Sequence, residues 1–149
     1  MTAAEARSRL AVARVAHLAT ASAEARPHVV PCTFAVLDDT TIVSAIDHKP
    51  KRTTALHRLA NIAANPEVAL LADHYAEDWD ALWWARADGT ARVVGPDTEP
   101  TLRAAALRSL AARYAPYRER PPEGPLVVIA VRRWSGWSAA CRAVPRGSG

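Results

Sequence analysis

The feature that most constrains the fold is a series of extended runs joined by connections of only a few residues. Strand-like residues occupy Val15 to Ala21, Arg26 to Leu37 and Thr40 to Ile46, one directly after another. Strands that follow each other through short turns pair antiparallel, because a parallel pair needs a crossover of about a dozen residues or more. The sequence therefore predicts an antiparallel, barrel-like sheet rather than a parallel sheet with alternating helices.

The rest of the chain continues this plan. Apolar residues at helical spacing predict helices over 2–14, 51–65 and 98–114, the last capped by Asp97 or Thr98. Strands are predicted over 67–74, 82–86, 90–94 and 126–131, and Asp88-Gly89 by itself predicts a tight hairpin turn between the middle two. A proline-rich loop leads to the last strand. This order predicts an α+β fold with the helices outside the sheet.

The second extended run contains two prolines, Pro27 and Pro31. Each proline removes a backbone donor from a sheet, so this strand is predicted to be interrupted or at an edge near Pro31. Backbone groups left free there can contact a ligand, which makes Pro31, Cys32 and Thr33 candidate contact residues. An ordinary edge strand would show the same spacing, and both interpretations stay open.

The helix that follows the first three strands is strongly basic at its start. Pro50 suits the first turn of a helix, and no acidic residue occurs between His48 and Pro66. Four cations fall in this stretch, namely Lys49, Lys51, Arg52 and Arg58. A helix N-terminus already carries partial positive charge and unpaired N–H groups, so these side chains predict a phosphate or carboxylate site. A solvated basic helix face is the alternative.

Composition excludes several classes of function. The chain has 149 residues, and this length predicts one domain over 1–140 followed by a frayed tail over 141–149. The formal net charge of +4 favours an acidic ligand. Cys32 and Cys141 lack metal-ligand or redox spacing, and we expect no bound metal. No nucleic-acid motif, signal peptide or membrane-length apolar run is apparent, so we expect a cytoplasmic protein without nucleic-acid or membrane partners. Dinucleotide, P-loop and nucleophile-elbow motifs are also missing, so a cofactor would have to carry any chemistry.

The densest aromatic group is Leu82-Trp83-Trp84, and Trp134 and Trp137 follow near the end of the chain. Strand alternation puts Trp83 and Trp84 on opposite faces, so at least one indole is expected to face a pocket or a partner. Burial of both in the core is the alternative. Because one small barrel cannot easily cover this much aromatic surface, we expect a homodimer.

Several short motifs, taken in their order along the chain, resemble the pyridoxamine 5′-phosphate oxidase-like superfamily. They are Leu18-Ala19-Thr20, Arg26-Pro27-His28-Val29-Val30-Pro31, Lys49-Pro50-Lys51-Arg52, Arg58-x-x-Asn61, Asn65-Pro66-x-Val68 and Asp88-Gly89-x-Ala91. A narrower set is similar to the actinobacterial branch presumed to use the deazaflavin coenzyme F-420, namely Asp47-His48-Lys49-Pro50-Lys51, Ala72-Asp73-His74-Tyr75, Asp78-Trp79 and Leu82-Trp83-Trp84.

The resemblance implies an antiparallel split β-barrel of six strands in a Greek-key-like order, and a homodimer with flavin-type cofactors in two clefts between the subunits. It also implies that Asp88-Gly89 is a bulge in one long bent strand rather than a turn. The cofactor-binding residues that it implies lie in strands, in the basic helix and near the end of the chain: Pro31, Cys32, Thr33, Ile46, Lys49, Lys51, Arg52, Arg58, Asn61, Trp83, Trp84 and Arg133. Trp134 joins Arg133 in closing the cleft.

The function that the resemblance implies is hydride transfer from reduced coenzyme F-420 to a small unsaturated substrate, and no side chain is assigned a catalytic role. Two alternatives stay open, an FMN-dependent oxidase or reductase of the same fold, and a protein that binds flavin, deazaflavin or haem without turnover. The arginine and histidine positions that true pyridoxamine phosphate oxidases carry near the C-terminus are not matched, which argues against vitamin B6 chemistry.

Overall fold

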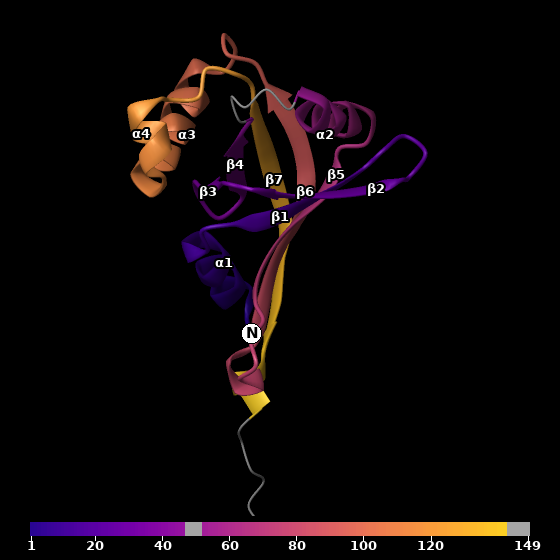
Figure 1. Ribbon diagram of the computed structural model, residues 1–149, viewed down its shortest axis with the longest axis vertical. Helices are drawn as coiled ribbons and strands as arrows, with labels where there is room; N and C mark the ends of the chain where they lie inside the picture. Colours follow the sequence, from indigo (N-terminus) through magenta and orange to yellow (C-terminus); the bar gives the residue numbers. More distant parts are fainter. Residues whose placement is uncertain (47–51, 143–149) are drawn as a thin grey trace, which may run out of the picture.

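The computed structural model describes residues 1–46 and 52–142 of the chain (Figure 1). It contains one antiparallel sheet with strand order β2-β1-β5-β6-β7-β4-β3. The elements in chain order are α1 (Ala3–Val12), β1 (Ala16–Ala21), β2 (Pro27–Cys32), β3 (Ala35–Val36), β4 (Thr41–Ala45), α2 (Arg52–Ala64), β5 (Glu67–His74), η1 (Trp79–Ala81), β6 (Trp83–Val94), α3 (Pro100–Arg113), α4 (Ala115–Glu119), β7 (Leu126–Ser138) and η2 (Ala139–Arg142).

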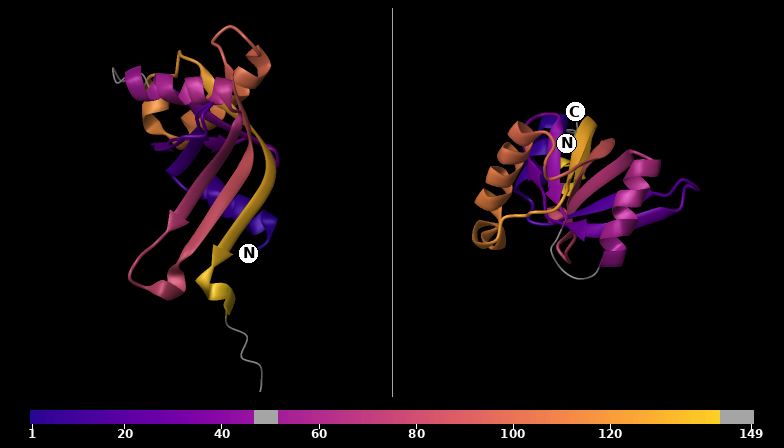
Figure 2. Two further views of the ribbon diagram at one scale, coloured as in Figure 1. Left: turned by 90° about the vertical axis from the view of Figure 1, so that its right-hand side faces the viewer. Right: turned by 90° about the horizontal axis from the view of Figure 1, so that it is seen from above.

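The predicted α+β class and antiparallel sheet are confirmed, but the predicted number of six strands is wrong. The sheet has seven strands because the extended run 26–37 breaks into β2 and β3 at Thr33-Phe34. These two strands lie at opposite edges of the sheet although only two residues separate them. The sheet must therefore curl until its edges meet at this break, which gives a split barrel (Figure 2).

The strands β6 and β7 form the longest pair, and they extend beyond the rest of the barrel toward the lower end in Figure 1. Asp88 pairs with Arg133 but Gly89 pairs with Val131, so Arg132 is the extra residue of a bulge in β7. The hairpin turn predicted at Asp88-Gly89 is wrong, because both residues lie inside the continuous strand β6. The continuous strand and the irregularity at Asp88-Gly89 that the family resemblance implies are confirmed, but the extra residue lies opposite them in β7.

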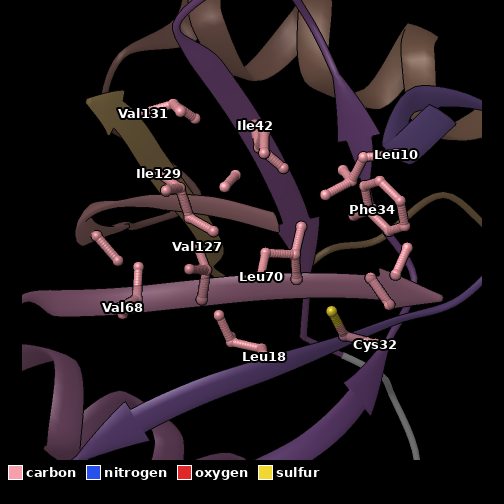
Figure 3. Packing of buried hydrophobic residues seen from close by; sticks show 14 of the residues in the cluster. Leu10, Leu18, Cys32, Phe34, Ile42, Val68, Leu70, Val127, Ile129 and Val131 are labelled. Atoms are coloured by element: carbon pink, nitrogen blue, oxygen red, sulfur yellow. The ribbon is translucent and has the colours of Figure 1, made fainter. Parts of the chain in front are cut away.

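Two clusters of buried side chains hold the fold together. The first fills the barrel, where α1 contributes Leu10 and the β2–β3 break contributes Phe34, both fully buried (Figure 3). The second lies between the sheet and the helices α3 and α4, which form the connection from β6 to β7. Its fully buried members include Val43 and Leu110. The connection from β6 to β7 is therefore packed against the sheet.

The helix ends differ in part from the predictions. Thr2 and Glu5 form a capping box at the start of α1. Neither Asp97 nor Thr98 caps α3, because Glu99 occupies the N-cap with a left-handed backbone (φ 48°) just before Pro100. The short helix α4, which was not predicted, lies between α3 and the prolines of the predicted loop. Among the described residues, no helix has both the length and the apolar character needed to cross a bilayer.

Candidate functional site

The break between β2 and β3 is held by side chains from distant parts of the chain. The Ser44 hydroxyl of β4 donates a hydrogen bond to the Thr33 carbonyl oxygen at 2.7 Å. The Tyr114 hydroxyl accepts from the Phe34 N–H at 3.2 Å and lies 2.9 Å from the Arg14 carbonyl oxygen, to which it can donate. These side chains hold the backbone at Thr33 and Phe34 in place of the strand-to-strand hydrogen bonds that the break removes. The backbone at Thr33 can therefore take part in a site.

A cleft of about 230 Å³ lies beside this break. It is lined by residues of three strands or strand ends and two helices, namely Val15, Pro31, Cys32, Thr33, Ala45, Arg58 and Tyr117. Four predicted site residues, Pro31, Cys32, Thr33 and Arg58, are thus brought together by the fold. A larger hollow of about 490 Å³ lies beside α1, but none of the predicted site residues lines it. We take the smaller cleft as the candidate site because the predicted residues converge there.

Arg58 is the charged residue of this cleft lining. It is half-buried on α2, and its Nε atom is buried with no hydrogen-bond partner among the described residues. A buried donor without a partner costs free energy, so such a group calls for an explanation. An anionic group of a ligand in the cleft would supply the missing acceptor, and a guanidinium is well suited to phosphate or carboxylate.

Cys32 contributes little chemistry of its own. Its side chain is 9% exposed and points toward Leu18 and Leu70 of the barrel core (Figure 3). Burial raises the pKa of the Cys32 thiol, against the opposing effects of a hydrogen bond with Ser44 and the positive charge of Arg58. The thiol is therefore protonated at neutral pH and is a poor nucleophile.

The helix α2 is held against the sheet by polar contacts. The buried side chain of Asn61 donates a hydrogen bond from Nδ2 to the Thr20 hydroxyl at 3.1 Å. His57 stacks on His28 of β2, with ring centroids 5.6 Å apart. Asn61 was predicted to bind the cofactor, but it does not line the cleft, because its amide anchors α2 to β1. Through this anchor it fixes the position of Arg58, one turn earlier on the same helix.

The other predicted site residues lie elsewhere in the chain. Trp83 packs under the guanidinium of Arg9, 5.2 Å from the ring centroid, and Trp84 packs against Arg86. Arg133 forms an ion pair with Asp88 at 3.2 Å. None of these three predicted residues lines the cleft of one chain. Trp134, predicted with Arg133 to close the cleft, instead donates from Nε1 to the Asp39 carbonyl oxygen at 2.8 Å.

The remaining predicted residues border or fall in the segment 47–51. Ile46 is half-buried, packs against the barrel core and donates its N–H to the Pro125 carbonyl oxygen at 3.4 Å. Lys49 and Lys51 lie outside the described residues, and Arg52 is the first residue of α2. Their part in an anion site stays a prediction. Nearly all of the predicted tail 141–149 also lies outside the described residues.

Sequence reasoning missed Tyr117, which enters the cleft lining from α4. Its hydroxyl lies 2.8 Å from the Thr33 Oγ1 atom, and the two residues are 84 positions apart in the chain. No local pattern reports a contact over that separation. The only available signal was the helical spacing of Tyr114 and Tyr117 around Pro116, which predicts a turn of helix with both rings on one side.

A curled antiparallel sheet, split at one edge and flanked by a few helices, defines the class of flavin-binding split barrels. The chain belongs to the pyridoxamine 5′-phosphate oxidase family, whose family model matches residues 2–138. The superfamily implied by the sequence motifs is therefore confirmed. No match is found among curated proteins.

Solved structures from several bacteria share this fold. A conserved hypothetical protein from Mycobacterium tuberculosis is similar with a TM-score of 0.70 and 23% identity, covering 100% of this chain and 92% of that one. A FAD-binding protein from Mesorhizobium loti matches with a TM-score of 0.69 and 21% identity, covering 91% and 94%. The heme storage protein HutZ from Vibrio cholerae matches with a TM-score of 0.65 and 20% identity, covering 91% and 90%. At these identities the likeness concerns the fold alone.

Proposed function

We propose that this protein binds a flavin-type cofactor through its phosphate and ring, and uses it as an oxidoreductase on a small unsaturated substrate. The observation that carries the proposal is the buried Arg58 Nε, which has no partner among the described residues and belongs to a cleft-lining side chain. Membership of the pyridoxamine 5′-phosphate oxidase family supports the same ligand class.

The residues of the cleft fit such a group. Arg58 supplies a cation for the phosphate, and the strip Pro31 to Thr33 offers a strand end and a hydroxyl for the edge of a ring. The cleft volume of about 230 Å³ in one chain is small for a whole dinucleotide-sized ligand, which agrees with a site completed by a second subunit. When bound, a reduced flavin or deazaflavin supplies the hydride, and the protein's own residues orient the ring and exclude water.

We propose the deazaflavin coenzyme F-420 as the preferred cofactor. Deazaflavin and FMN share a ring and a ribityl phosphate, but the deazaflavin carries a lactyl group and an oligoglutamate tail with further negative charges. The sequence places Lys49, Lys51, Arg52 and Arg58 together, which is more positive charge than one phosphate requires. Exposed charge pairs contribute roughly 0.2–1 kcal/mol each and are screened by salt. We expect a preference of about ten- to a hundredfold for F-420 at low ionic strength.

Haem binding without turnover is the second candidate, supported by the fold of the Vibrio heme storage protein. The described lining of the cleft contains no histidine, and burial keeps the Cys32 thiol protonated. The described lining therefore offers neither a histidine nor a thiolate as axial ligand, and the hydroxyl of Tyr117 is hydrogen-bonded to Thr33. A phosphate-bearing cofactor fits these residues better.

Titration of the apo-protein with F-420, FMN and haem at two salt concentrations tests the proposal. We expect F-420 to bind most tightly at low salt, with a preference over FMN that shrinks as salt is added. Equal affinities, or an FMN preference that salt leaves unchanged, would instead support an FMN-dependent enzyme. Tight haem binding without binding of either flavin would support the second candidate. For turnover, reduced F-420 is mixed with a conjugated unsaturated substrate and its oxidation is followed by absorbance.

A further inference from the structure

Tyr117 is the one member of the described cleft lining that comes from the α3–α4 connection. Its hydroxyl pairs with the Thr33 Oγ1 atom at 2.8 Å. The family resemblance assigned no role to either α4 or Tyr117. We infer that Tyr117 is a positioning residue: it orients the Thr33 hydroxyl toward the cleft and so selects ligands that present a hydrogen-bond acceptor on a flat ring. The inference rests on the proposed function and deepens it.

The placement of Tyr117 is fixed by the elements around it. Its ring meets the Tyr114 ring edge-on, with centroids 5.7 Å apart, and Tyr114 in turn holds the β2–β3 break through Phe34. The guanidinium of Arg113 donates to the carbonyl oxygens of Ala11 and Ala13 at the end of α1. The end of α3 and Tyr114, which come directly before α4, are therefore held against both α1 and the break. This anchoring keeps the Tyr117 hydroxyl at Thr33.

The direction of the hydroxyl pair follows from its chemistry. Either oxygen can donate, but a phenolic O–H is the stronger donor and an aliphatic hydroxyl the better acceptor. When Tyr117 donates to Thr33, the proton of Thr33 is left to point at another acceptor. The hydrogen bond from Ser44 to the Thr33 carbonyl oxygen fixes the backbone at Thr33, and the contact with Tyr117 holds the Oγ1 atom. Because Thr33 lines the cleft, a ring carbonyl bound there can accept this proton.

This arrangement separates two kinds of recognition within one cleft. Arg58 recognises the phosphate of a cofactor, whereas the Tyr117–Thr33 pair recognises its ring. Riboflavin carries the ring without the phosphate, and FMN carries both. The two ligands therefore distinguish a residue that acts on the ring from one that acts on the phosphate.

The test compares Tyr117→Phe with Arg58→Ala and with Tyr75→Phe, which removes a hydroxyl from a side chain that is 64% exposed. FMN and riboflavin affinities and the visible absorption bands of the bound flavin are measured for each variant. Loss of one neutral hydrogen bond corresponds to about a fivefold loss in affinity. We expect Tyr117→Phe to weaken FMN and riboflavin equally by about this factor and to shift the flavin bands, while Tyr75→Phe matches the wild type. Arg58→Ala should weaken FMN alone.

A double variant tests whether Tyr117 acts on the ligand through Thr33. Thr33→Val should reproduce the loss seen in Tyr117→Phe, and the two changes together should cost no more than one. The Thr33 variant also supplies the test if Tyr117→Phe fails to fold. Wild-type affinity and spectrum in both single variants would overturn the inference while leaving the proposed function intact. If the wild-type protein binds neither flavin nor deazaflavin, both fail.

Discussion

The replacement Arg58→Ala should separate cofactor affinity from protein stability. In the folded chain, the Nε atom of Arg58 is buried and lacks a partner among the described residues. A donor in this state costs roughly 1–3 kcal/mol, and the packing of the side-chain stem offsets part of that cost. Removing the guanidinium should therefore change the free energy of unfolding of the apo-protein by no more than about 1 kcal/mol.

The expected loss in affinity is larger. A charge-assisted hydrogen bond to a phosphate contributes about 1.5–3 kcal/mol, which corresponds to roughly a 10- to 150-fold weaker affinity for FMN or F-420. Arg58→Lys keeps the charge but loses the planar fork, so it should recover only part of the affinity. Arg113→Ala is the matched control for stability. It removes hydrogen bonds to Ala11 and Ala13 and the cation–π contacts with Phe34 and Tyr114, so we expect a loss of about 2–4 kcal/mol.

Urea unfolding of the apo-proteins, followed by circular dichroism, measures the stability of each variant, and fluorescence titration measures affinity. The reasoning is refuted if Arg58→Ala destabilises the apo-protein as much as Arg113→Ala, since Arg58 would then be a structural residue. It is also refuted if Arg58→Ala keeps full affinity for FMN and F-420. In that case the basic stretch is a solvated helix face, the alternative that the sequence left open.

Three further outcomes are expected. Gly89→Ala should lower the melting temperature and the free energy of unfolding by about 1–3 kcal/mol. A Cβ at this position would lie 2.9 Å from the Ala130 carbonyl carbon and 3.0 Å from the Val131 Cα atom. An unchanged melting curve would contradict the close approach of β6 and β7 at the bulge. Light scattering at micromolar concentration should give the mass of a dimer, and a stable monomer would rule out a two-subunit site. The hydrogen bond from Arg132 lowers the pKa of Glu67, so this pair stabilises the fold above the unfolded-state pKa and the effect fades as pH falls through the folded-state value. Acid unfolding of Glu67→Gln should accordingly converge with that of the wild type at low pH, and a difference that persists there would refute the linkage.

The parts of the fold that the sequence predicted are those set by local pattern. The strand Glu67–His74 has the predicted ends, because its own apolar residues determine the alternating burial that the structure shows. The turn predicted at Asp88-Gly89 failed for a physical reason. Gly89 is needed where the backbones of β6 and β7 cross closely at the bulge, and a glycine for close approach has the same local signature as a glycine for a turn.

The same limit applies to the candidate site. Pro31 indicated an interruption of the strand because proline removes a backbone donor. Arg58 was predicted as an anion-binding residue from its charge, and it lies in the cleft, but its binding role stays a prediction. Tyr117 could not be predicted, since its role depends on a contact with Thr33 that only the folded chain creates. The anchoring role of Asn61 was hidden in the same way, because the position of its partner Thr20 depends on how α2 packs on the sheet.

The predicted site residues form two groups that lie apart in the chain. Pro31, Thr33 and Arg58 line one cleft, whereas Trp83 and Trp84 lie on the long β6 strand and contact arginines outside it. The neighbouring end of the molecule also leaves large aromatic side chains in solvent: Trp79 at 76% and Trp137 at 37% exposure. Exposed aromatic surface of this kind is typical of an interface. A second copy packed on the β6–β7 arm would cover these rings and could bring its own tryptophans to the partner's cleft. A single contact between two chains would then account both for the exposed rings and for the separation of the two residue groups.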